Sequence, residues 1–173
     1  MKISSLLIVV IFLSFINNVN AEQKIVYIDM DKVVSTSISG LSLLKKLNNI
    51  NNKNLKFLKE EEIKLKDKET KLISQKSIIS QTELTKLTNE LKSEIKMYNQ
   101  NRKKIITDFN KLKIDNTNNL LNLINPILAK FSDDEEISII LQKKDLVIGK
   151  TELDITDEII KIIDTEIKEF KVK

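Results

Sequence analysis

The sequence predicts a mainly helical α+β fold in which a long antiparallel helical hairpin projects from a small β-sheet body. The main observation is an 85-residue stretch, 41–125, that contains no glycine, no proline and no cysteine. Globular domains usually turn every dozen or so residues, so this stretch favours very long helices that fold back on each other. Strand patterns at 24–29 and 137–148 flank it. We therefore predict a body at 22–40 and 126–173 and an arm at 41–125.

The first 21 residues, 1–21, have the pattern of a cleavable secretory signal. Lys2 precedes an almost unbroken apolar run, Leu6–Ile16, and Ala21 ends a triplet typical of a cleavage site. An uncleaved membrane anchor is the alternative, but an apolar run of about 11 residues is shorter than the ~20 needed to cross a bilayer. Cleavage near Ala21 would leave a mature chain, 22–173, as a single domain.

Seven-residue spacing of apolar residues predicts that the two arm helices pack along a coiled-coil seam. The step from Ile79 to Leu84 is five residues and breaks the repeat, so we predict the tip of the hairpin near Ser80–Glu83. The alternative is one continuous helix with a stutter in the repeat, about 130 Å long at 1.5 Å per residue. The predicted seam comprises Leu58, Leu65, Leu72 and Ile79, then Leu84, Leu91, Tyr98, Ile105 and Leu112.

The second apolar position of each heptad is poorly filled. Ile95 and Phe109 are apolar there, whereas the equivalent positions elsewhere hold Glu62, Glu69, Lys76, Thr88 and Arg102. A strong coiled coil needs apolar residues at both positions, so we expect the arm to bend and splay.

The body is predicted to contain three short strands and one amphipathic helix. The strand patterns lie at 24–29, 137–141 and 146–148, and the long arm helix is expected to begin after Gly40. An apolar stripe at 159–167 predicts a last helix that packs on the sheet.

The chain lacks cysteine, so no disulfide can support a fold with a small apolar core. Strands this short do not form a stable sheet within one chain, and we therefore predict that they are buried in a sheet shared by an oligomer. The predicted interface residues are Ile25, Tyr27, Ile28, Ile139, Leu141 and Val147.

Positive charge is concentrated on the arm. Residues 53–113 contain 16 Lys or Arg and 9 Asp or Glu, whereas residues 114–173 contain 8 and 13. Ion pairs at i,i+4 spacing would account for some of these lysines as a solvated helix face. Nucleic acid is not favoured as a partner, because the arm has one arginine, few aromatic residues and an export signal upstream. A basic arm outside the cytoplasm would instead meet acidic proteins, anionic lipid head groups or lipopolysaccharide.

The side chains that most often carry catalysis are missing from the sequence. The chain has no His and no Cys, its two glycines stand apart, and the acidic run 133–136 lacks the ligand spacing of a Ca²⁺ loop. We therefore predict no enzymatic activity, no metal site and no cofactor, and we interpret the acidic run as a solvated turn.

The two end segments carry a family resemblance. Lys24–Val34 (KIVYIDMDKVV) and Asp154–Ile160 (DITDEII), with the long hairpin and the 137–148 strand pattern between them, resemble the Skp/OmpH family of periplasmic chaperones. The resemblance implies a homotrimer in which strands of three chains form a small β-barrel and three helical arms enclose a cavity. It also implies an ATP-independent holdase that keeps unfolded outer-membrane β-barrel proteins from aggregating before their insertion.

On this interpretation, lysines near the predicted tip would attract acidic unfolded clients before apolar contacts form. They are Lys64, Lys66, Lys68, Lys71, Lys76 and Lys86. The alternative function is a structural coiled-coil envelope protein that spaces or tethers membrane layers. Such a spacer would share the export signal and the heptads, but it would not need strands at both ends that meet after a hairpin.

Overall fold

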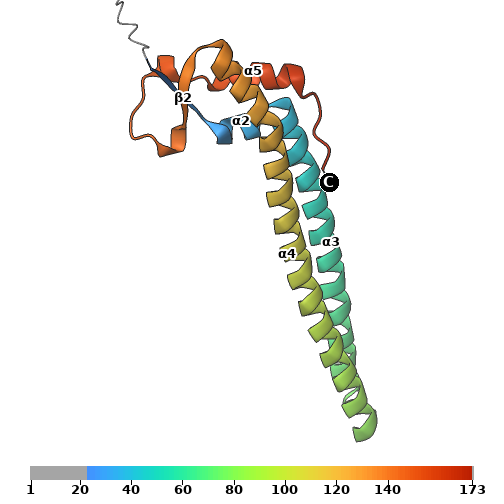
Figure 1. The fold of residues 1–173 in the computed structure, drawn as a ribbon. Coiled ribbons are helices and arrows are strands. Elements are labelled where there is room, and N and C mark those ends of the chain that lie inside the picture. The colour runs from blue at the N-terminus through green and yellow to red at the C-terminus, as the bar shows by residue number, and fades with distance from the viewer. Residues whose placement is uncertain (1–22, 173) are drawn as a thin grey trace, which may run out of the picture.

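A computed structural model describes residues 23–172, so the predicted signal segment and its cleavage site lie outside the described residues. Figure 1 shows a small body from which two long helices extend side by side as an arm. The mainly helical fold with a small sheet agrees with the prediction. The elements in chain order are β1 (Lys24–Ile28), α2 (Met30–Thr36), α3 (Ile38–Gln75), α4 (Gln81–Asp134), β2 (Ile137–Gln142), the 3₁₀ turns η1 (Lys143–Asp145) and η2 (Thr151–Leu153), and α5 (Thr156–Glu166).

The arm is a hairpin and not one continuous helix, but its turn lies earlier than the predicted tip. α3 ends at Gln75, the turn spans 76–80, and α4 begins at Gln81. The Ser80 hydroxyl accepts a hydrogen bond from the Glu83 N–H at 3.2 Å and so caps the first turn of α4. The polar residues at 80–83 therefore cap and begin the second helix, and only Ser80 belongs to the turn.

The long helix begins before Gly40 and not after it. Ser37 caps α3 by accepting a hydrogen bond from the Gly40 N–H at 3.1 Å, which places Gly40 in the first helical turn. Asp29 caps the preceding helix, α2, in the same way through the Lys32 N–H at 2.9 Å. β1 is therefore followed by two successive helices, the short α2 and the arm helix α3, and a side chain fixes the start of each.

β1 and β2 pair in parallel to form a two-stranded sheet, in which Ile25 lies opposite Ile139 and Ile28 opposite Gln142. A parallel pair needs a long connection between its strands, and the helical arm supplies it. The hairpin therefore brings the two strands that flank it together, as the sequence predicted.

The predicted third strand at 146–148 does not form. β2 leads into η1, and the chain then crosses to the other edge of β1. There Asp154 makes an isolated parallel bridge with Tyr27, and the Ile155 N–H donates a hydrogen bond to the Tyr27 carbonyl at 3.0 Å. A segment that must reach this edge cannot fold back along β2, so the predicted strand hairpin is wrong for the single chain.

The core lies where the root of the arm meets the sheet and α5. It contains apolar side chains from β1 and β2 and from α2, α3, α4 and α5. Ile159 and Ile163 belong to the apolar stripe predicted for the last helix and are fully buried. α5 packs mainly on α2, α3 and α4 and not, as predicted, mainly on the sheet. A two-stranded sheet is too narrow to cover the stripe, whereas the three helices together offer a broad apolar surface.

α4 carries the chain from the arm into the body without interruption. Pro126 lies inside this helix, which ends at Asp134, beyond the predicted boundary between arm and body at 125. The first half of the acidic run belongs to α4, and Glu135 and Glu136 make the turn into β2, with Glu136 at a positive φ of 54°. Within residues 23–172, none of the helices is both long enough and apolar enough to cross a membrane.

Candidate functional site

The seam that holds the arm together lies where the seven-residue repeat predicted it, but it is thin. Leu58, toward the root, is buried, whereas Leu65, Leu72 and Leu91 nearer the tip are only half-buried. The Tyr98 hydroxyl donates a hydrogen bond to the Leu58 carbonyl across the seam at 3.4 Å. Two helices without a third layer cannot enclose their shared seam, so the arm keeps apolar surface accessible along its length.

On α3 the second heptad position differs from the prediction by one residue, whereas on α4 the predicted positions Thr88 and Phe109 are half-buried. Glu62 and Glu69 are exposed, and Glu61 and Lys68 lie next to the seam instead. Lys68 Nζ lies 2.6 Å from Glu94 Oε1 and so links α3 to α4. An ion pair therefore links the two helices beside the seam leucines, and the expected bending and splaying of the arm stay a prediction.

The six lysines predicted to attract clients are all exposed, but they differ in their partners. Lys64 pairs with Glu61 at 2.7 Å, and the hydrogen bond from Lys64 to Glu61 raises the pKa of the lysine amine. Lys68 pairs with Glu94. The structure spreads the six over α3, the turn and α4 and does not gather them at one point, so their joint role stays a prediction. In the described part of the chain, no ion pair includes Lys66, Lys71, Lys76 or Lys86.

The sheet has one apolar face that the chain leaves open. Side chains alternate between the two faces of a strand. Val26 and Ile28 are buried in the core, whereas Ile25, together with Ile139 and Leu141 on β2, is exposed. Three apolar side chains of the small sheet therefore stay accessible on this face.

The six predicted interface residues therefore fall into two groups. Tyr27 and Ile28 are buried by their own chain, and Gly149 packs directly against the Tyr27 ring. The other four are exposed. Val147 and its neighbour Ile148 are almost completely exposed in the segment that crosses the body.

A groove of about 780 Å³ opens at the root of the arm. Met30, Val34 and Leu121 contribute apolar surface to it, and Asn118 and Asn122 of α4 contribute amides. Sequence reasoning missed this groove, because its lining comes from both strands and three helices that only the fold brings together.

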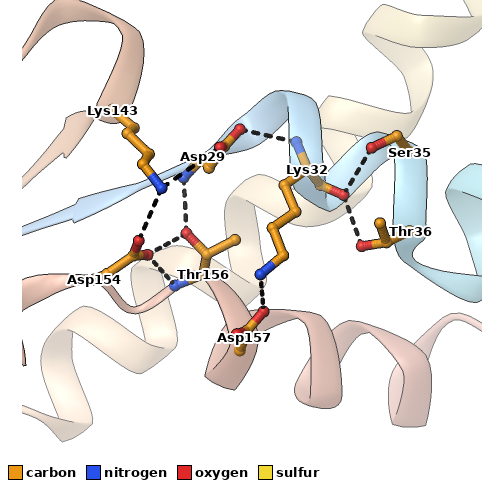
Figure 2. Close-up of polar contacts among 8 residues, drawn as sticks. All are labelled: Asp29, Lys32, Ser35, Thr36, Lys143, Asp154, Thr156 and Asp157. Carbon is orange, nitrogen blue, oxygen red and sulfur yellow. Dashed lines mark hydrogen bonds and ion pairs between the residues drawn. The ribbon is translucent and has the colours of Figure 1, made fainter. Parts of the chain in front are cut away.

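Figure 2 shows a polar cluster that joins β1 and α2 to the start of α5. The Thr156 hydroxyl accepts a hydrogen bond from the Asp29 N–H at 2.9 Å and donates one to the Asp154 carboxylate. The same carboxylate accepts from the Thr156 N–H at 3.0 Å, and Lys143 Nζ lies 3.2 Å from it and 3.8 Å from Asp29. The cluster therefore holds the two end motifs of the sequence against each other.

Acidification is expected to weaken this cluster. Partial burial raises the pKa of Asp154, but the hydrogen bonds from Thr156 and the nearby Lys143 outweigh it and hold the pKa below its ordinary value. A carboxyl group whose pKa is lower in the folded state stabilises the fold above its unfolded pKa of about 3.9. This contribution is lost as pH falls through the lowered folded-state pKa.

Asp154→Asn should therefore destabilise the protein by roughly 1–3 kcal/mol at pH 7. The difference from the native protein should shrink as the pH falls below about 3.9. Urea unfolding at several pH values measures both effects. Asp145→Asn is the control, because it removes the same charge from an exposed position in the same segment. A difference at Asp154 that stays constant down to the most acidic pH would contradict the assignment.

Sequence reasoning also missed Phe170, which lies after α5 in the C-terminal tail. Its ring is buried in the core, and its carbonyl accepts a hydrogen bond from Lys46 Nζ of α3 at 2.5 Å. No periodic pattern marks a residue outside regular structure, so the sequence gives little signal for it. Across residues 23–172, no group of three or more Asp or Glu side chains is placed to hold a metal ion.

Comparisons with known proteins agree with this architecture. The family model described as outer membrane protein (OmpH-like) matches residues 24–163. The fold is similar to a solved structure described as an outer membrane chaperone (OmpH-like) from Caulobacter crescentus CB15, with a TM-score of 0.79, 16% sequence identity and coverage of 86% of this chain and 88% of that chain. A search among curated proteins found no match. The family match confirms the resemblance carried by the two end motifs, and this chain belongs to the OmpH-like family of outer membrane proteins.

Proposed function

We propose that this protein is an ATP-independent holdase chaperone of the periplasm that binds unfolded outer-membrane β-barrel proteins between helical arms and prevents their aggregation. The observation that carries the proposal is the arm, in which two long helices share a half-exposed seam and present exposed lysines. An unfolded client offers apolar and charged side chains without fixed geometry, so a long, accessible, basic surface suits it better than a shaped pocket. Family membership and the similar solved structure support the same role.

We infer that the working assembly is a homotrimer whose sheets form one small barrel. Within the described residues, the sheet has only two strands, and one edge of β2 has no strand beside it. A sheet of this size is marginal alone, and an open edge with an apolar face is a surface for association. Neighbouring chains would cover Ile25, Ile139, Leu141 and the 146–148 segment, and the three arms would leave the body around a cavity.

The direct test is dilution of a urea-unfolded outer-membrane β-barrel protein into buffer with and without the mature protein, residues 22–173. The expected result is that the protein suppresses aggregation without added ATP. Turbidity measures the aggregation. A spacer that tethers membrane layers would share the coiled-coil arm but would leave aggregation unchanged. That second result would end the holdase proposal.

Assembly is tested separately by Ile139→Asp, which should shift the mass measured by light scattering from trimer toward monomer. A carboxylate on the open sheet face would have to be desolvated between chains. Ile63→Asp is the matched control, because Ile63 on the arm is 47% exposed and Ile139 is 45% exposed. Trimers of equal stability in both variants would show that the open face is not the interface. Ile28→Asp is less informative, because Ile28 lies in the core of its own chain.

A further inference from the structure

The seam divides the surface of the arm into two sides. On each helix, the residues one and four positions after a seam residue lie on the first side of the arm. The residues one position before and three positions after a seam residue lie on the second side. The contacts agree, because Lys68 and Glu94, three positions after Leu65 and Leu91, meet across the arm. We name the first side the basic side and the second the balanced side, and both are counted between residues 57 and 113.

The balanced side carries equal numbers of positive and negative side chains, five of each. Three of its five lysines lie in ion pairs, Lys64 with Glu61 at 2.7 Å, Lys68 with Glu94 at 2.6 Å and Lys104 with Asp108 at 2.5 Å. The remaining charges are Lys71, Lys111, Glu83 and Glu90. An acidic polypeptide that approaches this side meets as many carboxylates as cations.

The basic side has a clear positive excess. It carries six cations against two carboxylates, Glu62 and Glu69, which places four of the seven excess positive charges of residues 53–113 here. Among the described residues, this side holds one ion pair, between Lys59 and Glu62 at 3.4 Å. The cations are Lys59, Lys66, Lys76, Lys92, Arg102 and Lys113.

Exposed isoleucines lie between these cations. Ile73, Ile95 and Ile106 all belong to the basic side and are exposed. Arg102 and Ile106 also line a depression of about 270 Å³ on α4. A guanidinium beside an exposed aliphatic side chain can pair with a carboxylate and cover apolar surface of the same short peptide segment.

We propose that the basic side is the surface of the arm that binds acidic, partly apolar segments of unfolded polypeptide, with the depression at Arg102 and Ile106 as a contact point. This inference rests on the proposed holdase function and narrows it to one side of the arm. Of the six lysines predicted from the sequence, Lys66 and Lys76 lie on the basic side. Lys64, Lys68 and Lys71 lie on the balanced side, and Lys86 faces away from the seam.

The test compares two triple variants with matched chemistry. The basic-side variant combines Ile95→Ser, Arg102→Gln and Ile106→Ser, and the balanced-side variant combines Phe57→Ser, Met97→Ser and Lys104→Gln. Each removes two exposed apolar side chains and one cation. Far-UV circular dichroism and light scattering establish that fold and assembly are retained. The probe is a urea-unfolded, acidic outer-membrane β-barrel protein with a fluorescent label, diluted into buffer at ~0.1 M salt.

The basic-side variant should bind the probe at least about tenfold more weakly than the native protein, and the balanced-side variant within about twofold of it. Raising the salt concentration should reduce the difference between the two variants, because exposed charges are screened. A loss in the balanced-side variant equal to or larger than that in the basic-side variant would overturn the assignment. A native protein that binds no unfolded client would instead reject the holdase function itself, which is a different outcome from equal losses in the two variants.

Discussion

Phe170→Ala is expected to lower the free energy of unfolding by about 3–5 kcal/mol, the usual cost of removing a buried phenyl ring. Phe170 is 4% exposed and packs in the core, although it belongs to a tail without helix or strand. Around it, Lys46 of α3 pairs with Glu169 at 2.8 Å and also donates to the Phe170 carbonyl. The tail therefore connects α5 to the root of the arm. Loss of the ring removes the apolar packing of this connection and leaves its polar contacts.

Phe57→Ala is the matched control, because it removes the same ring from an arm position that is 45% exposed. Its effect should stay within about 0.5 kcal/mol, as for most surface substitutions. Urea unfolding of both variants at one fixed protein concentration measures the difference, since association also contributes to stability. Equal, small losses in the two variants would show that the tail does not hold the body together.

Phe170 also shows which features of the fold could not be predicted from the sequence. The arm could be predicted because its signal repeats, with leucines seven residues apart from Leu58 to Leu72 and again after Leu84. A repeat that extends over many residues indicates long paired helices even when one boundary is placed wrongly. The hairpin was therefore predicted although its turn was misplaced. Phe170 stands alone between Glu169 and Lys171, and only the packing of the folded core buries it.

The body was harder to predict for the same reason. The segment at 146–148 has the composition of a strand, but the chain must carry Asp154 to Tyr27 on the far edge of β1, and this requirement overrides local propensity. For the candidate site, the sequence supplied the excess of positive charge on the arm. The two sides follow from the predicted seam, but the sequence could not supply which lysines on each side are held in ion pairs, because this depends on the side-chain contacts in the fold.

Gly40→Ala is expected to destabilise the protein by at least about 2 kcal/mol, against the direction that helix propensity predicts. Alanine should gain about 1 kcal/mol over glycine inside a helix. A Cβ at this position, however, would overlap the Val34 carbonyl oxygen and lie 2.9 Å from Ser37 Oγ. The Val34 carbonyl belongs to the backbone of α2 and cannot rotate away, so α2 and α3 would have to move apart at the root of the arm.

Gly149→Ala is the control, because a Cβ there would lie 2.7 Å from Tyr27 Cε1, a side-chain atom next to a loop. A ring at the edge of the sheet can shift more easily than a helix backbone, so the loss should be smaller than that in Gly40→Ala. Urea unfolding compares the two variants under identical conditions. If Gly40→Ala proves neutral or stabilising, propensity has outweighed the clash, and α2 and α3 are not in the close backbone contact that fixes the arm to the body.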